Sequence, residues 1–354
     1  MNYAAIIWHR SKDNDKAPTI EQISKISTIQ RQIMKAILGC FWTTPTTALE
    51  TETALTPPQH RLCNKILHTI TRLQTALLNH LIQQWINRAL RNEGELSHKF
   101  NLENLVNHFP EFFDSKIEKI YSYVRSPWWT LEATIHIALN KEAAEKSHNE
   151  TLALATQQNA LVIYTDGSGI NGRISAATYS PTTTETVRKY FETEAQFNVY
   201  GAELEAIGSA AEQARRHIQQ YRKCVIFADS QAAIKAIAKP RRQSGQSIIK
   251  KILDTIDAIH QENQDYEIHL QWVPSHQNIN GNERADQKAK KAALTSSSGE
   301  ELSESRLRSA KHQLIRFKLN QEWRNEWNNG TENARQLRNL CRSIDEVEPG
   351  AQIY

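Results

Sequence analysis

The sequence predicts an α/β domain whose sheet is partly antiparallel and partly parallel, with helical segments before and after it along the chain. Strand-like runs appear only from about residue 158, after a long stretch of helical periodicity. Three such runs come first, followed by helix, strand, one or two helices, strand and helix. This order combines hairpins with the crossover connections of a parallel sheet. The 354 residues allow two or three domains, because about 100–200 residues per domain is usual.

Residues 1–155 are expected to form a helical region. Isoleucines at steps of three and four residues predict a helix over 19–42, and a leucine-rich stripe predicts another over 59–90. Prolines at 45, 57 and 58 separate the two. We interpret both stripes as surfaces for packing against other helices, since nothing in them indicates chemistry. The polar residues 140–158 form either a linker or a frayed helix, and we place a domain boundary near 155.

The α/β domain is expected over residues 156–294. Its strands are predicted at 160–166, 174–181, 186–193, 223–230 and 266–276, and its helices at 201–221, 231–239, 246–262 and 282–293. The stretch "LTSSSGEELSES" at 294–305 then reads as a polar linker. Residues 295–354 are therefore expected to be a linker, a helix over 302–328 and a C-terminal tail.

Composition restricts the class of protein. The formal net charge of +4 is too small to identify a nucleic-acid-binding protein by itself. The four cysteines are widely separated and form no C-x-x-C pair, which indicates neither a zinc site nor a disulfide framework. No apolar run approaches the ~18 residues of a membrane span, and the N-terminus does not resemble a signal peptide. We expect an intracellular, soluble protein without membrane association.

Four acidic residues stand at informative places. Asp166 and Asp229 each end an apolar strand, and the carboxyl ends of neighbouring strands in an α/β sheet meet at one edge. Glu203 lies in the first turns of the first helix of the domain, beside small residues that allow close approach to the sheet, and Asp286 lies in the opening turn of the last. Taken singly, each is more often a turn or helix-capping residue. Glu205, two residues after Glu203, should face solvent.

Together these four carboxylates would repel one another without a matching set of basic residues. Divalent cations resolve the repulsion, and hard oxygen ligands suit Mg²⁺, with Mn²⁺ as the alternative. Two such ions form the usual clamp for in-line displacement at a phosphodiester. We therefore predict a two-metal site held by Asp166, Glu203, Asp229 and Asp286.

Two further features accompany the carboxylates. His276 lies in the loop "WVPSHQNINGNERAD", where a lone histidine is usually inert. Ten residues before Asp286, it becomes a candidate proton carrier or product-release group. The stretch "KPRRQSGQSIIKK" is a basic patch, which alone would be a solvated surface but beside a nuclease site could contact phosphate.

Residues 158–294 resemble the type 1 ribonuclease H domain through "YTDGSG", "GAELEAI", "FADSQAAI" and "WVPSHQNINGNERADQKAK", in the order of that family. The resemblance implies a mixed five-stranded sheet with helices on both faces. It also implies that Asp166, Glu203, Asp229 and Asp286 are metal-binding catalytic carboxylates and that His276 is the loop histidine. By the same resemblance Gly167, Ser168 and Gly169 form a tight turn that meets the RNA strand, and Gln231 and Asn282 approach the hybrid. The chain departs from some members at Val199, Tyr200 and Gly201, where those members place polar residues that touch the substrate.

The flanks resemble a different context. "YAAIIWHR" and the segment "IQRQIMKAILGCFWTTPTTALETETALTPPQHRL" are similar to the segment after the polymerase domain in non-LTR retrotransposon reverse transcriptases, and "EWRNEW" is similar to the segment after ribonuclease H in those proteins. The polymerase's own aspartate motif is not in this chain. The resemblance implies a C-terminal part of such a polyprotein, without DNA synthesis.

The function that these features indicate is endonucleolytic cleavage of the RNA strand of RNA–DNA hybrids with two Mg²⁺ ions and no organic cofactor. RNA would be selected through its 2′-hydroxyl groups. Two alternatives stay open. The chain could be a catalytically silent nucleic-acid-binding remnant, or it could carry out the reaction of integrases and resolvases, which share this architecture and also use carboxylates.

Overall fold

The computed structural model describes residues 18–77, residue 84, residues 117–295 except 192, 195 and 276, and residues 306–328. The chain divides into two compact units. One contains residues 75–77 and 116–311, and the other contains residues 1–74, 78–115 and 312–354. Each is described by itself. In the described part of the chain, no helix is both long and apolar enough to cross a membrane.

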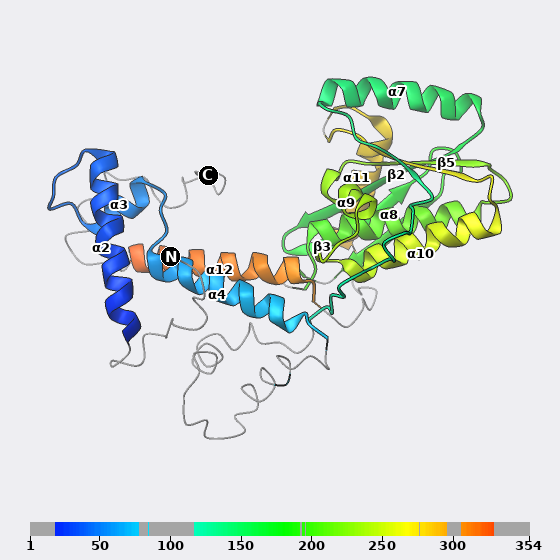
Figure 1. The fold of residues 1–354 in the computed structure, drawn as a ribbon. Coiled ribbons are helices and arrows are strands. Elements are labelled where there is room, and N and C mark those ends of the chain that lie inside the picture. Colours follow the sequence, from blue (N-terminus) through cyan, green and yellow to red (C-terminus); the bar gives the residue numbers. More distant parts are fainter. Residues whose placement is uncertain are drawn as a thin grey trace. The chain divides into compact units, whose positions relative to one another are not determined.

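The first unit is built on a mixed sheet (Figure 1). Its strands are β1 (Thr134–His136), β2 (Leu161–Ile170), β3 (Arg173–Tyr179), β4 (Thr186–Phe191), β5 (Lys223–Ala228) and β6 (Glu267–Trp272). They lie in the order β1-β6-β5-β2-β3-β4. β2, β3 and β4 pair antiparallel, whereas β5 pairs parallel with β2 and β6. The predicted mixed sheet and its five strands are confirmed. β1 adds a sixth strand, parallel to β6, which the sequence did not reveal because three residues are too few to show a period.

The turn of the first hairpin lies later than expected. β2 continues through Gly167 and Gly169, which pair with Ala176 and Ile174 of β3. The chain reverses instead at Asn171 and Gly172, whose φ angles of 52° and 75° suit the two-residue turns that join twisted antiparallel strands. The tight turn expected at residues 167–169 is therefore wrong. The parallel pairing of β2 with β5 does end at Thr165, so Asp166 still follows the carboxyl end of the parallel ladder.

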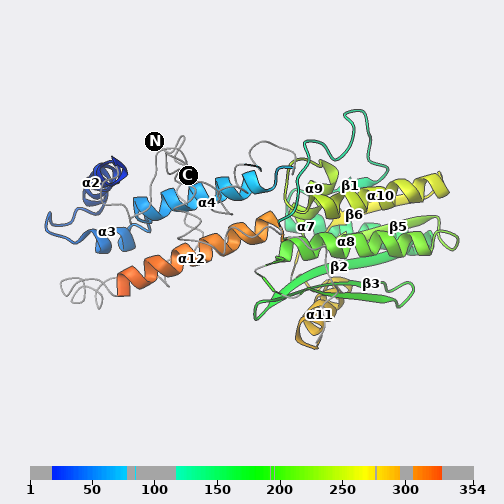
Figure 2. The same ribbon diagram turned by 90° about the horizontal axis from the view of Figure 1, so that it is seen from below.

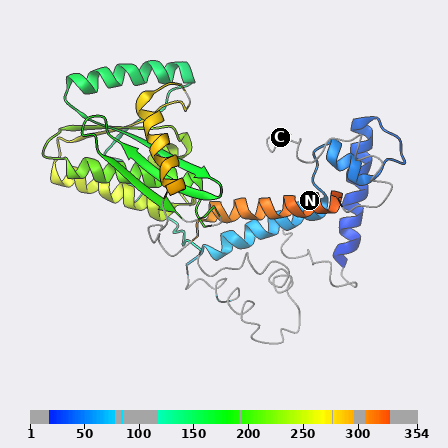
Figure 3. The ribbon, with the colours of Figure 1, turned by 180° about the vertical axis from the view of Figure 1, so that it is seen from behind.

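Helices cover both faces of this sheet. α8 (Val199–Arg216) and α10 (Gln246–Glu262) pack side by side on one face, with the short α9 (Gln231–Ala238) nearby (Figure 2). α11 (Asn280–Thr295) crosses the strands on the other face, where α7 (Lys141–Gln157) also lies (Figure 3). Leu161 and Ile163 of β2 belong to the core beneath α8, and Val162 and Tyr164 to the core beneath α11. A strand buried on both faces explains why β2 reads as a continuous apolar run.

Of the two alternatives for residues 140–158, the structure contains the helix. The side chain of Asn140 accepts a hydrogen bond from the Ala143 N–H at 2.8 Å and so caps α7. The boundary expected near residue 155 falls inside this helix, and Ala155 is buried in the core beneath α11. The division of the chain into domains at 155 and 294 stays a prediction.

The second unit contains α2 (Pro18–Leu38), α3 (Thr46–Glu52), α4 (Pro58–Gln74) and α12 (Arg308–Asn328) from residue 312 onward. His60 of α4 lies 2.9 Å from Glu326 of α12. The helix predicted over 59–90 ends at Gln74, because residues 75–77 are not helical; most of its second half lies outside the described residues. The helix-packing interpretation of the isoleucine stripe is wrong for Ile33 and Ile37 of α2, which are 51 % and 67 % exposed.

Candidate functional site

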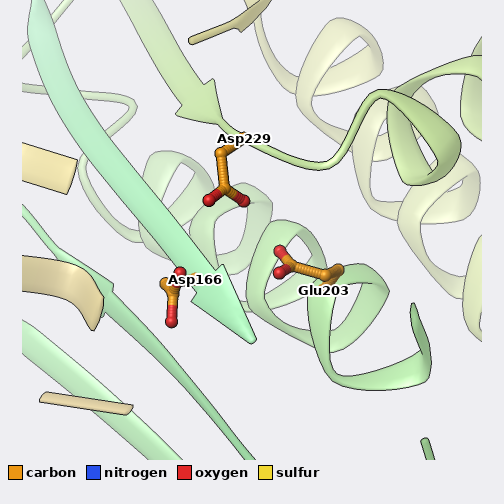
Figure 4. Close-up of side chains that lie close together, drawn as sticks. All are labelled: Asp166, Glu203 and Asp229. Carbon is orange, nitrogen blue, oxygen red and sulfur yellow. The ribbon is translucent and has the colours of Figure 1, made fainter. Parts of the chain in front are cut away.

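Three of the four predicted carboxylates converge at one edge of the sheet. Asp166 belongs to β2, Glu203 to the second turn of α8, and Asp229 directly follows β5. Each offers one oxygen, and these three oxygens all lie within 4.8 Å of one another. Figure 4 shows the side chains entering the same space from a strand, a helix and the end of a neighbouring strand. The three carboxylates therefore lie close together, whereas their role in binding metal stays a prediction.

Glu203 reaches this edge because α8 lies unusually close to β2. A Cβ atom at Gly167 would stand 2.6 Å from the backbone nitrogen of Glu203 and 2.9 Å from the carbonyl carbon of Ala202. Atoms do not approach so closely, so only glycine permits this packing. The start of α8 is fixed by Asn198, whose side chain accepts from the Gly201 N–H at 3.1 Å. The glycine after Asp166 thus sets the position of a second carboxylate.

Asp229 is held from two sides. The indole Nε1 of Trp272, the last residue of β6, donates to the Asp229 carbonyl oxygen at 3.0 Å. The next residue, Ser230, caps α9 by accepting from the Ala233 N–H at 3.3 Å. These bonds fix the backbone of the residue between a strand and a helix, which orients its carboxylate toward the other two.

Asp286 stands apart from the cluster of three. It lies in the second turn of α11, because that helix begins two residues earlier than predicted. It is half-buried, and its Oδ2 accepts from Lys290 Nζ at 2.7 Å. Its negative charge nevertheless helps to raise the pKa of Asp166. The structure thus gives Asp286 a basic partner that the sequence analysis did not anticipate.

The electrostatics of the cluster favour a cation. Burial, together with the charges of Asp229 and Asp286, raises the pKa of Asp166 to about 8, and Lys290 opposes the rise only in part. Burial and the charges of Asp229 and Asp166 also raise the pKa of Glu203 well above its ordinary value, against a backbone hydrogen bond from Gly167. Carboxylates crowded in this way bind either protons or positive ions.

The surroundings of two buried oxygen atoms favour a bound metal ion over protonation alone. Asp166 Oδ2 and Glu203 Oε2 have no hydrogen-bond partner. Buried polar atoms without a partner are rare and require an explanation. Oxygen atoms of carboxylates are the ligands that Mg²⁺ and Mn²⁺ prefer. The donor set of Asp166, Glu203 and Asp229 therefore fits a divalent metal ion.

The remaining predicted site residues occupy different environments. Gly169 is exposed, Gly167 and Gln231 are half-buried, and Ser168 and Asn282 are buried. His276 lies outside the described residues. Glu205 is not solvated as expected, because it pairs with Lys189 of β4 at 3.1 Å and only 13 % of each side chain is exposed. This pairing removes Glu205 as a competitor for the role of Glu203.

Sequence reasoning missed two residues of the site. Lys290 follows Asp286 by four positions on one helix, a spacing that places side chains on the same face and was readable from the sequence. Trp272 meets Asp229 through the register of β5 and β6, in which Ala228 lies opposite Trp272. That register joins residues more than forty positions apart, and no local pattern reveals it.

One comparison with known proteins assigns a family match to this part of the chain. The family model described as RNase H matches residues 158–294. None of the curated proteins matches the chain. Among solved structures, the chain is similar to RNase H1 from the halophilic archaeon Halobacterium salinarum, at 16 % identity and a TM-score of 0.29 over 38 % of this chain and 97 % of that one. The N-terminal RNase H domain of a Mycobacterium tuberculosis protein has 14 % identity and a TM-score of 0.29, over 38 % and 94 %. An RNase H1 isolated from compost has 17 % identity and a TM-score of 0.29, over 38 % and 98 %.

Proposed function

We propose that the protein hydrolyses the RNA strand of RNA–DNA hybrids. The observation that carries this proposal is the cluster of Asp166, Glu203 and Asp229, with its two partnerless buried oxygens, inside the segment that matches the RNase H family. The raised pKa values of Asp166 and Glu203 mean that the crowded carboxylates favour a bound positive charge, which divalent cations can supply. Phosphodiester hydrolysis is the chemistry for which clustered carboxylates commonly hold such ions.

Asp166, Glu203 and Asp229 would hold Mg²⁺, with Asp286 as the fourth carboxylate. Bound divalent ions supply a water of lowered pKa and stabilise charge on the leaving oxygen. The carboxylates orient this chemistry, because their positions are fixed by Gly167, by the N-cap of α8 and by Trp272. His276 is proposed to carry a proton to or from the reacting groups, and Gly167, Ser168, Gly169, Gln231 and Asn282 to contact the hybrid.

In the proposed reaction the oxygen of a water molecule forms a bond to phosphorus, in line with the bond from phosphorus to the 3′ oxygen. That second bond breaks, and the 3′ oxygen takes a proton. The water loses its protons to solvent or to a nearby acceptor. The products are a 5′-phosphate and a 3′-hydroxyl.

The test is cleavage of a labelled hybrid in Mg²⁺ by the wild-type protein, by Asp229→Asn and by Asp265→Asn. Asp265 is exposed in the turn before β6, at the end of the strand opposite to the carboxylate cluster. It therefore controls for the loss of one negative charge. We expect Asp229→Asn to lower the rate about 100-fold or more, because metal stabilisation is worth several kcal/mol, and Asp265→Asn to leave it unchanged. Equal cleavage by all three proteins would contradict the proposal.

The same assay separates the alternatives. Duplex DNA of identical sequence should stay intact, whereas its cleavage in preference to the hybrid would indicate integrase-like or resolvase-like chemistry. Binding of the hybrid without any cleavage by the wild-type protein would indicate a silent remnant. An origin in a retrotransposon polyprotein, inferred from the resemblance of the flanking segments, is part of the same proposal.

A further inference from the structure

An exposed aromatic segment precedes β1, outside the residues that match the RNase H family. It runs from Tyr121 to Trp129, with the sequence "YSYVRSPWW". The side chains of Tyr121, Tyr123 and Trp128 are 55 %, 76 % and 83 % exposed. Large apolar rings are costly to hold in water, and a cluster of them on one segment marks a binding surface. The segment loops outward beside α10 in Figure 2.

The backbone of this segment is firmly attached to α10 at its first residue. The buried side chain of Gln246 accepts from the Tyr121 N–H at 2.7 Å and donates to the Tyr121 carbonyl oxygen at 3.0 Å. The same amide donates to the carbonyl oxygen of Arg241 at 3.0 Å. One buried amide thus joins the aromatic segment to the basic loop before α10.

A second attachment holds the other end. Arg125 donates to Asp254 at 2.6 Å and to Asp257 at 3.1 Å, and the Trp129 indole donates to Asp257 at 3.2 Å. From Gln246 to Asp257 the helix rises about 16 Å, which is the length of several stacked nucleotides at about 3.4 Å each. The backbone that carries the exposed rings is therefore attached to α10 at both ends of the segment.

Positive charge borders the rings. Lys239, Arg241 and Arg242 are exposed in the loop before α10, and the Arg242 guanidinium donates to the Ser122 hydroxyl at 2.9 Å. The acidic residues of the adjoining face, Asp254 and Asp257, are already paired with Arg125. A hollow of about 240 Å³ lies beside Tyr123, lined by residues 123–127.

We propose that these residues form a binding surface for single-stranded nucleic acid that continues from the hybrid. We call it the aromatic-basic surface: Tyr121, Tyr123, Trp128, Lys239, Arg241 and Arg242. Rings that stack on unpaired bases, bordered by cations that contact phosphates, are the usual means of holding a single strand. A protein partner would also bury exposed rings, but the bordering charge favours a polyanion. The proposal rests on the proposed function for the identity of the substrate.

The position of the surface suits this role. Asp229 is separated from the basic loop only by Ser230 and α9, which spans eight residues or about 12 Å. A strand emerging from the carboxylate cluster would therefore reach the aromatic-basic surface within a few nucleotides. The segment at 121–129 would extend substrate contact beyond the family-matched residues.

The test measures binding by the 354-residue chain carrying Asp229→Asn, which leaves the substrate uncut. The probes are a labelled blunt hybrid and the same hybrid with an unpaired extension on either strand. Adding Tyr123→Ala should weaken binding of the extended hybrid about tenfold, since stacking is worth roughly 1–3 kcal/mol per base and 1.4 kcal/mol is tenfold. Binding of the blunt hybrid should not change. Trp42→Ala, which removes another highly exposed ring, is the matched control and should match the parent on both probes.

A second variant tests the charge. Arg241→Ala should weaken binding and reduce the slope of log affinity against log salt by about one. Thermal unfolding of each variant tests whether the fold is intact. We expect the same midpoint as for the parent, because the replaced side chains are exposed. If Tyr123→Ala and Arg241→Ala bind both probes like the parent, the surface does not bind nucleic acid and a protein partner is its remaining occupant.

The outcome is independent of catalysis. If the wild-type protein cleaves the hybrid and the two variants bind like the parent, the aromatic-basic surface is overturned while the proposed function stands. If the wild-type protein does not cleave but binding depends on Tyr123, the surface stands and the proposed activity fails.

Discussion

The burial of Asp166 beside other carboxylates disfavours its charged form, and this should be measurable as a dependence of the free energy of unfolding on pH. Its pKa is raised from 3.8 to about 8. Between these values the folded protein keeps a proton that the unfolded chain has released, so the free energy of unfolding of the metal-free protein should fall as pH rises. Asp166→Asn does not titrate, and we expect it to be less pH-dependent and more stable than wild type at pH 8. Urea unfolding in a chelator over this range is the measurement.

Two additions sharpen that experiment. Asp265→Asn, at an exposed position, should show the wild-type profile. Mg²⁺ should stabilise wild type but not Asp166→Asn near pH 8, because a ligand that binds only the folded state raises its stability by mass action. If the free energy of unfolding of wild type and of Asp166→Asn depends on pH in the same way, the pKa of Asp166 is not raised in the folded protein.

Gly167 should tolerate no side chain, because a Cβ atom there would meet backbone atoms of Ala202 and Glu203 at 2.9 and 2.6 Å. We expect Gly167→Ala to destabilise the protein by about 1–3 kcal/mol, the usual range for overpacking, and to displace Glu203, which would lower hybrid cleavage. Gly208→Ala in α8 is the control, since the nearest neighbour of its added Cβ atom would be Ile252 Cγ1 at 3.4 Å. It should be neutral or stabilising by up to about 1 kcal/mol. Equal stabilities of the two variants would refute the close-approach argument.

At the scale of elements, the local sequence pattern was sufficient to predict a strand or helix where that segment packs against the core over its whole length. The strands at 161–163 and 224–228 were readable because they are apolar and bounded by turn residues, and α8 was readable from its periodicity. The end of β2 was misplaced because Gly167 and Gly169 resemble turn residues, whereas the structure uses their missing side chains for close packing. A sequence does not distinguish these two uses of glycine.

Glu118 illustrates an element contact that the sequence does not reveal. This buried carboxylate accepts from the Ser244 hydroxyl at 2.5 Å, from the Gly245 N–H at 2.9 Å and from the Arg308 N–H at 2.7 Å. It therefore joins three segments, widely separated in the sequence, at the start of α10. A single glutamate just before an aromatic segment carries no local sign of this role.

Removing that carboxylate should destabilise the fold at this junction. We expect Glu118→Ala to lower the free energy of unfolding by about 3 kcal/mol, because buried donors would be left without an acceptor. Glu118→Gln keeps one acceptor oxygen and should lose roughly half as much. Urea unfolding of the three proteins is the measurement. A Glu118→Ala variant as stable as wild type would show that water replaces the carboxylate without cost.

At the scale of the molecule, the proximity of the three carboxylates was predictable, because Asp166 and Asp229 follow apolar runs of neighbouring strands and Glu203 lies near the start of a helix. The full extent of the folded unit was not predicted, because the segments that complete it are remote in sequence from the residues they pack against. β1 pairs with β6, Ala144 of α7 is buried in the core, and Leu307 and Ala310 are buried in the same core. These contacts are set by tertiary packing, which overrides local propensity in the linker-like composition around residue 140.

The compact unit therefore predicts which fragment of the chain should fold alone. A fragment of residues 158–294 would lack β1, α7, Glu118 and Leu307, and would expose the core residues that they cover. A fragment of residues 116–311 keeps all of them. Because exposed apolar area costs about 25 cal/mol per Å², we expect the shorter fragment to unfold at lower temperature and lower urea concentration, or to aggregate. Circular dichroism during heating and in urea compares the two directly. If both unfold at the same midpoint, the flanking segments do not contribute to the stability of the sheet, and the family-matched residues are a complete folding unit.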